Sequence, residues 1–314
     1  MTLKLACMFP VLPDGSFKGA FRLAAVLLFA WALSACSSLP HLYTSDETTR
    51  IEREKIEFGE ILWFAQRAKA AYLDEQDIKK IYPLTTRIKT PKGTGVQYFL
   101  EVIPKQKVQI IAIRGSDNLA NILEDIAYEK TVDNLLGFFL HRGIHNIALK
   151  IYADVKPHLN RKYKIKTTGH SLGAAVGVVL MMYLHRDGYS VSKSVNFGQP
   201  KVISAAGAKR FEWLPIVRVI NENDAIPMLP PLTIINPIHG IYEHVGSEII
   251  LLEKDRYVFL DKHAAMRISV GEFWRNIRNV SLGDHSMDRY IRKLMKMDSN
   301  ATQVSYANRE AYTN

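Results

Sequence analysis

The feature that most constrains this chain is the pentapeptide Gly169–Gly173, which reads Gly-His-Ser-Leu-Gly. It fits the pattern G-x-S-x-G, in which a serine sits on a sharp turn between a strand and a helix. Glycines are needed on both sides because larger side chains would collide where the two elements cross. Tyr163–Thr168 alternates as a strand does, and Leu172–Arg186 has the apolar spacing of a buried helix. A buried serine in a tight turn is the alternative, but this context favours Ser171 as a nucleophile.

The N-terminal segment predicts export rather than a part of the fold. Basic residues precede the apolar run Leu23–Leu33, which is too short to span a membrane comfortably. The run ends in Leu-Ser-Ala-Cys, which resembles a bacterial lipoprotein cleavage box. The resemblance implies that residues 1–35 are a signal peptide and that Cys36 receives lipid. Ser37 follows instead of the aspartate that retains lipoproteins at the inner membrane, which implies the outer membrane. An ordinary secretory signal with an incidental cysteine stays open.

Length and composition then limit what the remaining chain can be. Residues 36–314 suit one α/β domain, or less readily two small ones. We expect a polar tether over 36–50, the folded domain over 51–298 and a frayed polar tail over 299–314. The sequence has two cysteines, one in the leader and one at the lipidation site, so no disulfide is expected. No cofactor or metal is predicted.

The charge balance points to a partner surface. The formal net charge is +10, which favours attraction to anionic lipid headgroups. Nucleic acid is the competing partner for a basic chain, but a lipid-anchored, exported protein rarely meets one. We therefore expect lipid at a membrane surface as the partner and no nucleic acid; the sequence predicts no oligomeric state.

Apolar spacing predicts most of the secondary structure. The strand 108–113 is nearly all apolar, as in a central strand covered on both faces. The predicted elements are a helix over 58–72, a hairpin over 96–103 and 107–113, a helix over 144–159, strands over 191–197 and 216–220, a hairpin over 245–252 and 257–260, a short helix over 272–278 and a terminal helix from 285.

A family resemblance emerges at the end of the central strand. Ile113–Ser116 (Ile-Arg-Gly-Ser) resembles the oxyanion loop of the class 3 lipases, the family of the filamentous-fungal triacylglycerol lipases. The resemblance implies an α/β-hydrolase fold, with a mostly parallel sheet and helices on both faces. It also implies that the backbone N–H groups of Ser116 and Leu172 donate to an oxyanion. Asp224 stands in the position of the family's acid, and His285 in that of its base.

Chain order alone leaves the base open, because several histidines follow the acid. The resemblance favours His285 and gives structural roles to His244 and His141. Asp284, next to the predicted base, is a rival acid, although a neighbouring carboxylate usually points elsewhere and Asp224 ends a strand. The histidines that follow the acid are His239, His244, His263 and His285.

One argument for the site needs no family. Ser116, Ser171 and Asp224 each come just after a predicted strand. In open α/β sheets, ligands bind outside the carboxyl ends of the strands. If these strands run parallel, the three residues share one edge of the sheet.

The segment Asn121–Ile126 occupies the place of the family's lid and hinge, with Ile122 where a tryptophan is common. It lies within Asp117–Tyr128, which has the pattern of an amphipathic helix. Its apolar stripe could cover the serine in water and turn toward lipid at a membrane. An amphipathic helix packed permanently on the core is the alternative. The stripe consists of Leu119, Ile122, Leu123 and Ile126.

Together these features predict a serine hydrolase of lipid carboxylic esters, acting through an acyl-enzyme on Ser171. The substrate class, acylglycerols or phospholipids and lysophospholipids, comes from the resemblance. An esterase or thioesterase of soluble substrates is an alternative within the enzymes. A non-catalytic envelope lipoprotein that retains the fold is an alternative outside them.

Overall fold

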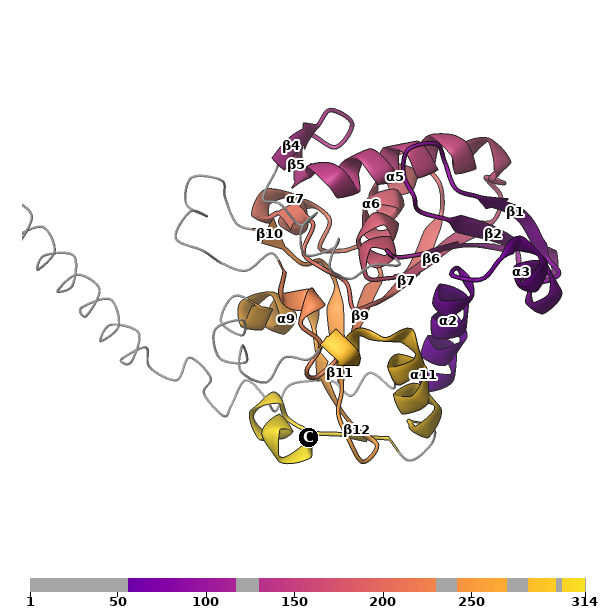
Figure 1. The fold of residues 1–314 in the computed structure, drawn as a ribbon. Helices are drawn as coiled ribbons and strands as arrows, with labels where there is room; N and C mark the ends of the chain where they lie inside the picture. The colour runs from indigo at the N-terminus through magenta and orange to yellow at the C-terminus, as the bar shows by residue number, and fades with distance from the viewer. Residues whose placement is uncertain (1–55, 117–129, 230–241, 270–281, 298–300, 314) are drawn as a thin grey trace, which may run out of the picture. The chain divides into compact units, whose positions relative to one another are not determined.

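The computed structural model describes residues 56–116, 130–229, 242–269, 282–297 and 301–313 (Figure 1). All of them belong to the unit Lys55–Asn314. The predicted signal peptide, Cys36, the tether and the lid residues lie outside the described residues. So do the short helix predicted over 272–278 and His239.

A nine-stranded sheet forms the centre of this unit, in the order β1-β2-β3-β6-β7-β9-β11-β12-β13. Its middle is parallel from β3 through β11, with antiparallel pairs at β1–β2, β2–β3 and β11–β12. The strands are β1 (Thr85–Lys89), β2 (Tyr98–Ile103), β3 (Val108–Ile113), β6 (Lys164–His170), β7 (Val191–Phe197), β9 (Ile216–Asn221), β11 (Ser247–Leu251), β12 (Arg256–Leu260) and β13 (Thr302–Gln303).

Several predicted strands are confirmed. Every residue of β3 is buried, as expected of a strand covered on both faces. Strands β2 and β3 form the predicted hairpin around the 3-10 turn η2 (Pro104–Gln106). Strands β11 and β12 form the other, with positive φ angles at Lys254 and Asp255 in the turn. Strands β3, β6, β7 and β9 are parallel, so their carboxyl ends share one edge of the sheet.

Helices cover both faces of the sheet (Figure 1): α5 and α6 lie on one side, and α2 and α11 on the other. Helix α11 begins at an N-cap, where the Ser286 side chain accepts a hydrogen bond from the Asp288 N–H. The helices and 3-10 turns are α2 (Phe58–Ala70), α3 (Glu75–Ile81), α5 (Arg142–Val155), η3 (Lys156–His158), α6 (Leu172–Arg186), α7 (Ala205–Arg210), η4 (Ile226–Met228), α9 (Lys262–Ser269), η5 (Leu282–His285), α11 (Met287–Lys296) and η6 (Tyr306–Tyr312).

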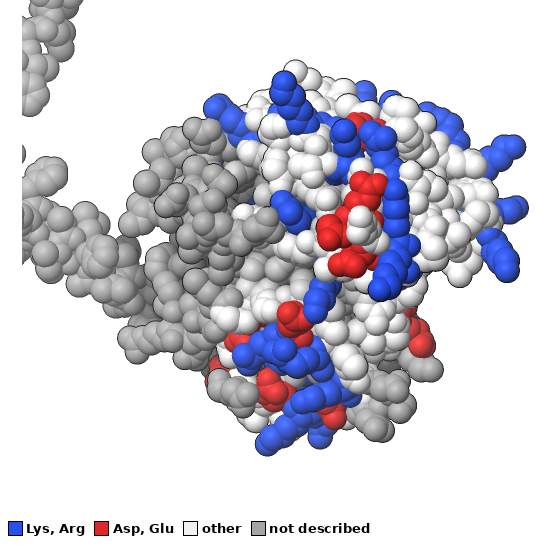
Figure 2. Space-filling model, turned by 45° about the vertical axis from the view of Figure 1, so that its right-hand side comes forward, with Lys and Arg blue, Asp and Glu red and all other residues white. Residues whose placement is uncertain are grey.

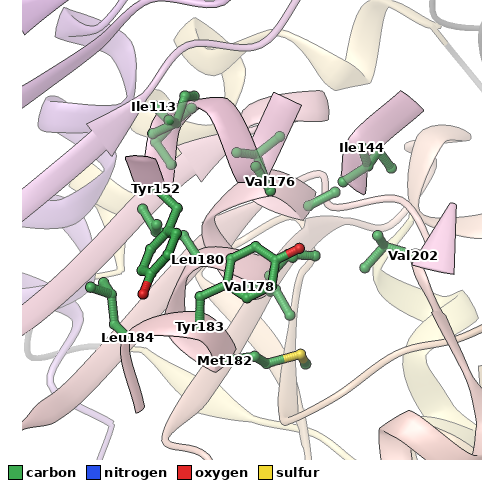
Figure 3. Close-up of a cluster of buried hydrophobic side chains, with 14 of the residues drawn as sticks. Ile113, Ile144, Tyr152, Val176, Val178, Leu180, Met182, Tyr183, Leu184 and Val202 are labelled. Carbon is green, nitrogen blue, oxygen red and sulfur yellow. The ribbon is translucent and has the colours of Figure 1, made fainter. Parts of the chain in front are cut away.

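Helix α6 is buried on all sides, as its continuous apolar sequence predicts. Its side chains Val176, Leu180 and Tyr183 lie in the main hydrophobic cluster, with Ile113 of β3 and Ile144 of α5 among their neighbours (Figure 3). Burial of this kind stabilises the fold by about 1.5–3 kcal/mol for each large apolar side chain. The helix that carries Ser171 at its start is therefore held firmly.

Some of the charges on the outer surface form pairs of opposite sign. Figure 2 shows lysine and arginine side chains interspersed with acidic ones over one face. Glu60 of α2 accepts from both Lys166 and Lys193, at 3.0 and 2.5 Å, and Lys69 pairs with Asp288 across α2 and α11. Exposed pairs contribute little to stability, so the apolar core dominates the free energy of folding.

Two parts of the fold were not predicted from the sequence. A second sheet, in the order β10-β8-β5-β4, lies beside α5 and α7. The other part is the C-terminal segment, which was expected to fray but packs on the domain. Strand β13 pairs in parallel with β12, and Arg309 is buried and donates to Glu222 at 3.1 Å. The second sheet consists of β4 (Lys130–Asp133), β5 (Phe138–His141), β8 (Ile203–Ser204) and β10 (Tyr242–Glu243).

A buried ion pair links two parallel strands next to the site. Arg218 of β9 and Glu248 of β11 are direct partners in the strand register, and an Arg218 nitrogen lies 2.5 Å from Glu248 Oε2. The Arg218 side chain is 1% exposed. Burial lowers the pKa of Arg218, and Glu248 opposes that shift. Removal of either charge alone would leave the other buried without compensation.

We expect Arg218→Met to lower the free energy of unfolding by about 3–5 kcal/mol, because it leaves the Glu248 carboxylate buried without the charge of Arg218 to compensate it. Urea denaturation followed by circular dichroism measures the loss. The double variant Arg218→Met/Glu248→Leu should recover much of it, since both desolvated charges are gone. A single-variant loss below about 1 kcal/mol would show that the pair contributes only as an exposed pair does.

Candidate active site

Ser171 occupies a strained turn between β6 and α6. Its backbone angles are φ 55° and ψ −125°, outside the regions that side-chain-bearing residues prefer. Gly169 makes the turn possible, because a Cβ there would lie 2.5 Å from the Gly173 carbonyl. The structure thus has the strand–turn–helix geometry that the G-x-S-x-G motif predicts.

The turn at Ser171 packs closely against the end of β3. A Cβ on Gly173 would lie 2.4 Å from the Ile113 carbonyl oxygen, so only glycine fits. A Cβ on Gly115 would lie 2.6 Å from the His170 carbonyl oxygen and 3.1 Å from Ser171 Cβ. The segment that carries Ser116 therefore lies directly against the turn that carries Ser171 and Leu172.

Asp224 and His285 come together although their separation in the sequence is 61 residues. His285 Nδ1 lies 2.8 Å from Asp224 Oδ2 and 3.0 Å from Oδ1. The Asp224 carboxylate also accepts from the Ile226 N–H at 2.9 Å and from the Tyr290 hydroxyl at 2.5 Å. Both Asp224 and His285 are buried. These donors compensate the carboxylate for the water it loses.

Tyr290 is a site residue that the sequence analysis missed. Its hydroxyl accepts a hydrogen bond from the Asn221 N–H at 3.2 Å, which leaves its own proton for Asp224. Burial raises the pKa of Tyr290 well above its usual value, and the Asp224 charge raises it further, so the hydroxyl stays protonated. In the sequence, Tyr290 looks like another buried residue on the apolar face of α11, and no motif marks it.

The serine and the histidine each have an atom ready for proton transfer. Ser171 Oγ and His285 Nε2 are buried and have no hydrogen-bond partner among the described residues. The two segments are adjacent, because the His170 ring, next to Ser171 in the chain, lies 4.4 Å from the His285 ring between centroids. Catalytic hydrogen bonds often tighten only when substrate binds.

A fourth glycine allows the histidine and the carboxylate to meet beside β7. Gly198 has φ +56°, and a Cβ there would lie 2.7 Å from His285 Cε1 and 2.9 Å from Asp224 Oδ2. Gly198 lies in the Phe-Gly-Gln-Pro segment that follows the strand. The contact of Gly198 with the site becomes visible only in the structure.

The rival residues have other contacts. His244 is buried and its Nε2 lies 2.8 Å from the Pro227 carbonyl; burial, then Arg218 and Lys201, lower its pKa well below the usual value. His263 is exposed. The Asp284 carboxylate lies 2.5 Å from Arg289 Nε. His141 is buried, with its ring 5.9 Å from that of Tyr242.

Two further searches cover only the described part of the chain. No group of three or more histidine, cysteine, aspartate or glutamate side chains in that part could hold a metal ion. None of the helices described there is long and apolar enough to cross a membrane.

Comparison with known proteins finds lipases and phospholipases. Residues 110–234 match the family model Lipase (class 3). Secreted mono- and diacylglycerol lipase 1 of Fusarium solani is 24% identical over 265 residues, which cover 71% of this chain and 74% of that protein. Phospholipase A1 PLIP1, chloroplastic, of Arabidopsis thaliana is 31% identical over 122 residues, 35% of this chain and 19% of that protein.

Among solved structures, the lipase from Rhizopus microsporus var. chinensis is similar with a TM-score of 0.58 and 21% identity. The likeness covers 73% of this chain and 85% of that one. The chain has the α/β-hydrolase fold, as the sequence predicted, and it is a carboxylic ester hydrolase. The support for this assignment is the match of residues 110–234 to the class 3 lipase model, together with the similarity to these lipid-ester hydrolases.

We expect Gly198→Ala to lower kcat on a short, water-soluble ester by roughly a hundredfold, because the new methyl group displaces His285 and Asp224. The matched control is Gly188→Ala. Gly188 also has a positive φ, +78°, but its Cβ would meet nothing closer than Arg161 at 4.0 Å. The control should lose some stability while keeping kcat per folded molecule, measured by titration with a fluorophosphonate. Equal effects on kcat would show that backbone strain, not the contact with the site, is responsible.

Proposed function

We propose that this protein hydrolyses carboxylic esters of lipids through an acyl-enzyme on Ser171, with His285 as the base and Asp224 as the acid. The observation that carries the proposal is the buried hydrogen bond between His285 Nδ1 and Asp224, 2.8 Å long, beside the strained Ser171 turn. A carboxylate on Nδ1 fixes the tautomer in which Nε2 can accept a proton.

The reaction follows from these positions. His285 Nε2 takes the proton of Ser171 Oγ while the oxygen attacks the ester carbonyl carbon. The negative charge on the carbonyl oxygen is stabilised by the backbone N–H groups of Ser116 and Leu172, whose segments pack against each other. The His285 imidazolium then protonates the leaving alcohol. A water molecule, deprotonated by His285, hydrolyses the acyl-enzyme in the second half.

Tyr290 and Ile226 support the acid during this cycle. Both donate to the Asp224 carboxylate, so its charge remains stabilised while His285 changes its protonation state. A buried carboxylate without these donors would tend to take up a proton itself. It would then stabilise the imidazolium less.

The acyl group and headgroup are the finer part of the proposal. The similar Fusarium protein is a mono- and diacylglycerol lipase by name, whereas the Arabidopsis protein is a phospholipase A1. We propose acylglycerols or phospholipids and lysophospholipids as the substrate class for this chain. A panel of esters with varied acyl chains and headgroups separates these substrates. Activity that does not rise above the aggregation concentration of the substrate would favour an esterase of soluble substrates instead.

We also propose that lipid on Cys36 anchors the enzyme to the bacterial envelope, most directly at the outer membrane. The support is the Leu-Ser-Ala-Cys box followed by Ser37, together with a basic chain of net charge +10. A tether of residues 36–50 would allow the domain to reach a nearby bilayer. The lid residues Leu119, Ile122, Leu123 and Ile126 would meet lipid in the same encounter.

We expect Ser171→Ala to abolish both fluorophosphonate labelling and ester hydrolysis, because no other side chain can form the acyl-enzyme. His285→Ala should lower kcat by roughly 10³–10⁶, since triad members act as a unit. Both are measured on a short ester, with thermal unfolding as the test of folding.

The matched control for His285 is His244→Ala. His244 is another buried histidine, but it bonds to the Pro227 carbonyl and not to a carboxylate. We expect it to lose stability while turnover per folded molecule is kept. Ester turnover by Ser171→Ala above background would contradict the triad, and a larger kcat loss in His244→Ala would make His244 the base.

We expect Cys36→Ser to release the protein from the membrane fraction, because the lipid anchor has no other attachment point in the proposed signal. Cell fractionation and intact mass measure this result. Wild-type protein should carry an added lipid mass that the variant lacks. Unchanged fractionation and mass would instead indicate an ordinary secretory signal, and Ser37→Thr serves as a control that leaves the cysteine in place.

A further inference from the structure

A chain of hydrogen bonds connects the segment before Ser116 to the backbone of His285. The Gly115 N–H donates to the Tyr72 hydroxyl at 3.1 Å. That hydroxyl lies 2.8 Å from His170 Nδ1, and His170 Nε2 lies 2.6 Å from the His285 carbonyl oxygen. Two side chains outside the triad thus span the distance between the two sides of the reaction centre.

The hydrogen-bond partners of His170 and Tyr72 determine which of their atoms carry a proton. A carbonyl oxygen only accepts, so His170 Nε2 must carry a proton and donate it to His285. The Tyr72 hydroxyl already accepts from Gly115, and its own proton can then go to His170 Nδ1. All donors in this arrangement have acceptors, with His170 as a neutral ring.

The surroundings of His170 favour that neutral form. Its side chain is buried, and its ring lies 4.4 Å from the ring of His285. Burial lowers the pKa of His170 well below its usual value, and the nearby His285 lowers it further. A neutral His170 can stay beside His285 when that residue becomes an imidazolium, whereas a charged one would repel it.

Gln97, which precedes strand β2, fixes the backbone on both sides of Tyr72. The Gln97 side chain donates to the carbonyls of Ala71 and Leu73, at 3.0 and 2.8 Å. The Gln97 carbonyl accepts from the Arg114 N–H at 2.9 Å, next to Gly115. The turn after α2 and the loop after β3 are therefore fixed by the same residue.

We propose that Tyr72 and His170 are positioning residues that hold the oxyanion segment and the His285 backbone in register with Ser171. Neither residue touches a reacting atom. Their hydrogen bonds fix the distance between the group that stabilises the oxyanion and the group that transfers the proton. This inference rests on the proposed ester hydrolysis, since it assigns a task within that same site.

The first test is Tyr72→Phe, which keeps the ring but removes the hydroxyl and with it the hydrogen bonds to Gly115 and His170. We expect kcat on a short, water-soluble ester to fall about tenfold, with KM changed less than about twofold. The rate of fluorophosphonate labelling should fall in parallel, because it requires the same attack and the same oxyanion. The melting temperature should change little, since Tyr72 is only partly buried.

The second test compares two substitutions of His170. Gln can donate from its amide nitrogen and accept at its amide oxygen, so His170→Gln can keep both contacts without a titratable ring. His170→Phe keeps a ring but neither contact. We expect His170→Gln to retain kcat within about threefold and His170→Phe to match the loss in Tyr72→Phe. Adding Tyr72→Phe to His170→Phe should cost little more, because the two residues act as one unit.

Tyr98→Phe is the matched control. Tyr98 is a buried tyrosine whose hydroxyl bonds to Arg87 and Asp154 instead of Gly115 and His170. It should lower the melting temperature and leave kcat unchanged. All rates are divided by the concentration of fluorophosphonate-titrated sites, so misfolded molecules do not count.

Unchanged kcat in Tyr72→Phe would overturn the proposal. Fully additive losses in the double variant, or a loss in His170→Gln as large as in His170→Phe, would overturn it too. The proposed function fails separately, since wild-type protein would then show no ester turnover and no labelling at Ser171.

Discussion

The structure depends on how closely helix α6 approaches the ends of β3 and β6. Gly173 lies where a Cβ would be 2.4 Å from the Ile113 carbonyl oxygen, and Gly169 where it would be 2.5 Å from Gly173. Because no side chain intervenes, the helix that begins after Ser171 starts right beside the loop after β3. The apolar burial of α6 then holds this contact, since the helix has no exposed face on which it could slide.

A second constraint is the desolvation of Asp224. The carboxylate is buried, and it remains there because it accepts hydrogen bonds from His285, Tyr290 and the Ile226 N–H. These donors come from three places in the chain: η5, α11 and the 3-10 turn η4. The C-terminal part of the domain thus completes a site whose nucleophile lies much earlier in the sequence. The base is therefore in place only when this part of the domain is folded.

His170 of the G-x-S-x-G motif connects the two constraints, the close approach of α6 and the burial of Asp224 with its partner His285. His170 ends β6, directly before the nucleophile, and its ring reaches across to the His285 carbonyl. Its other nitrogen faces Tyr72, which also accepts from Gly115. In the sequence this histidine occupies a variable position of the G-x-S-x-G pattern. Only the fold reveals that it lies between the two halves of the reaction centre.

The sequence by itself determined the parts of this protein that depend on local pattern. Glycine spacing fixed the turn at Ser171, apolar periodicity predicted α2, α5 and α6, and continuous apolar residues marked β3 as central. Strand ends that proved parallel placed the segments after β3, β6 and β9 at one edge. These features need only neighbours in the chain.

Only the tertiary structure decided which distant side chains meet. It paired His285 with Asp224 while His244 bonds to Pro227, and it brought in Tyr290, Tyr72 and Gly198. It also added β13 to the sheet from a segment whose polar sequence predicted fraying. Such contacts join residues far apart in the chain, and their energies depend on burial and on direction. The pattern of neighbouring residues in the sequence contains neither the burial nor the direction of these contacts, because both arise only when the strands and helices pack together.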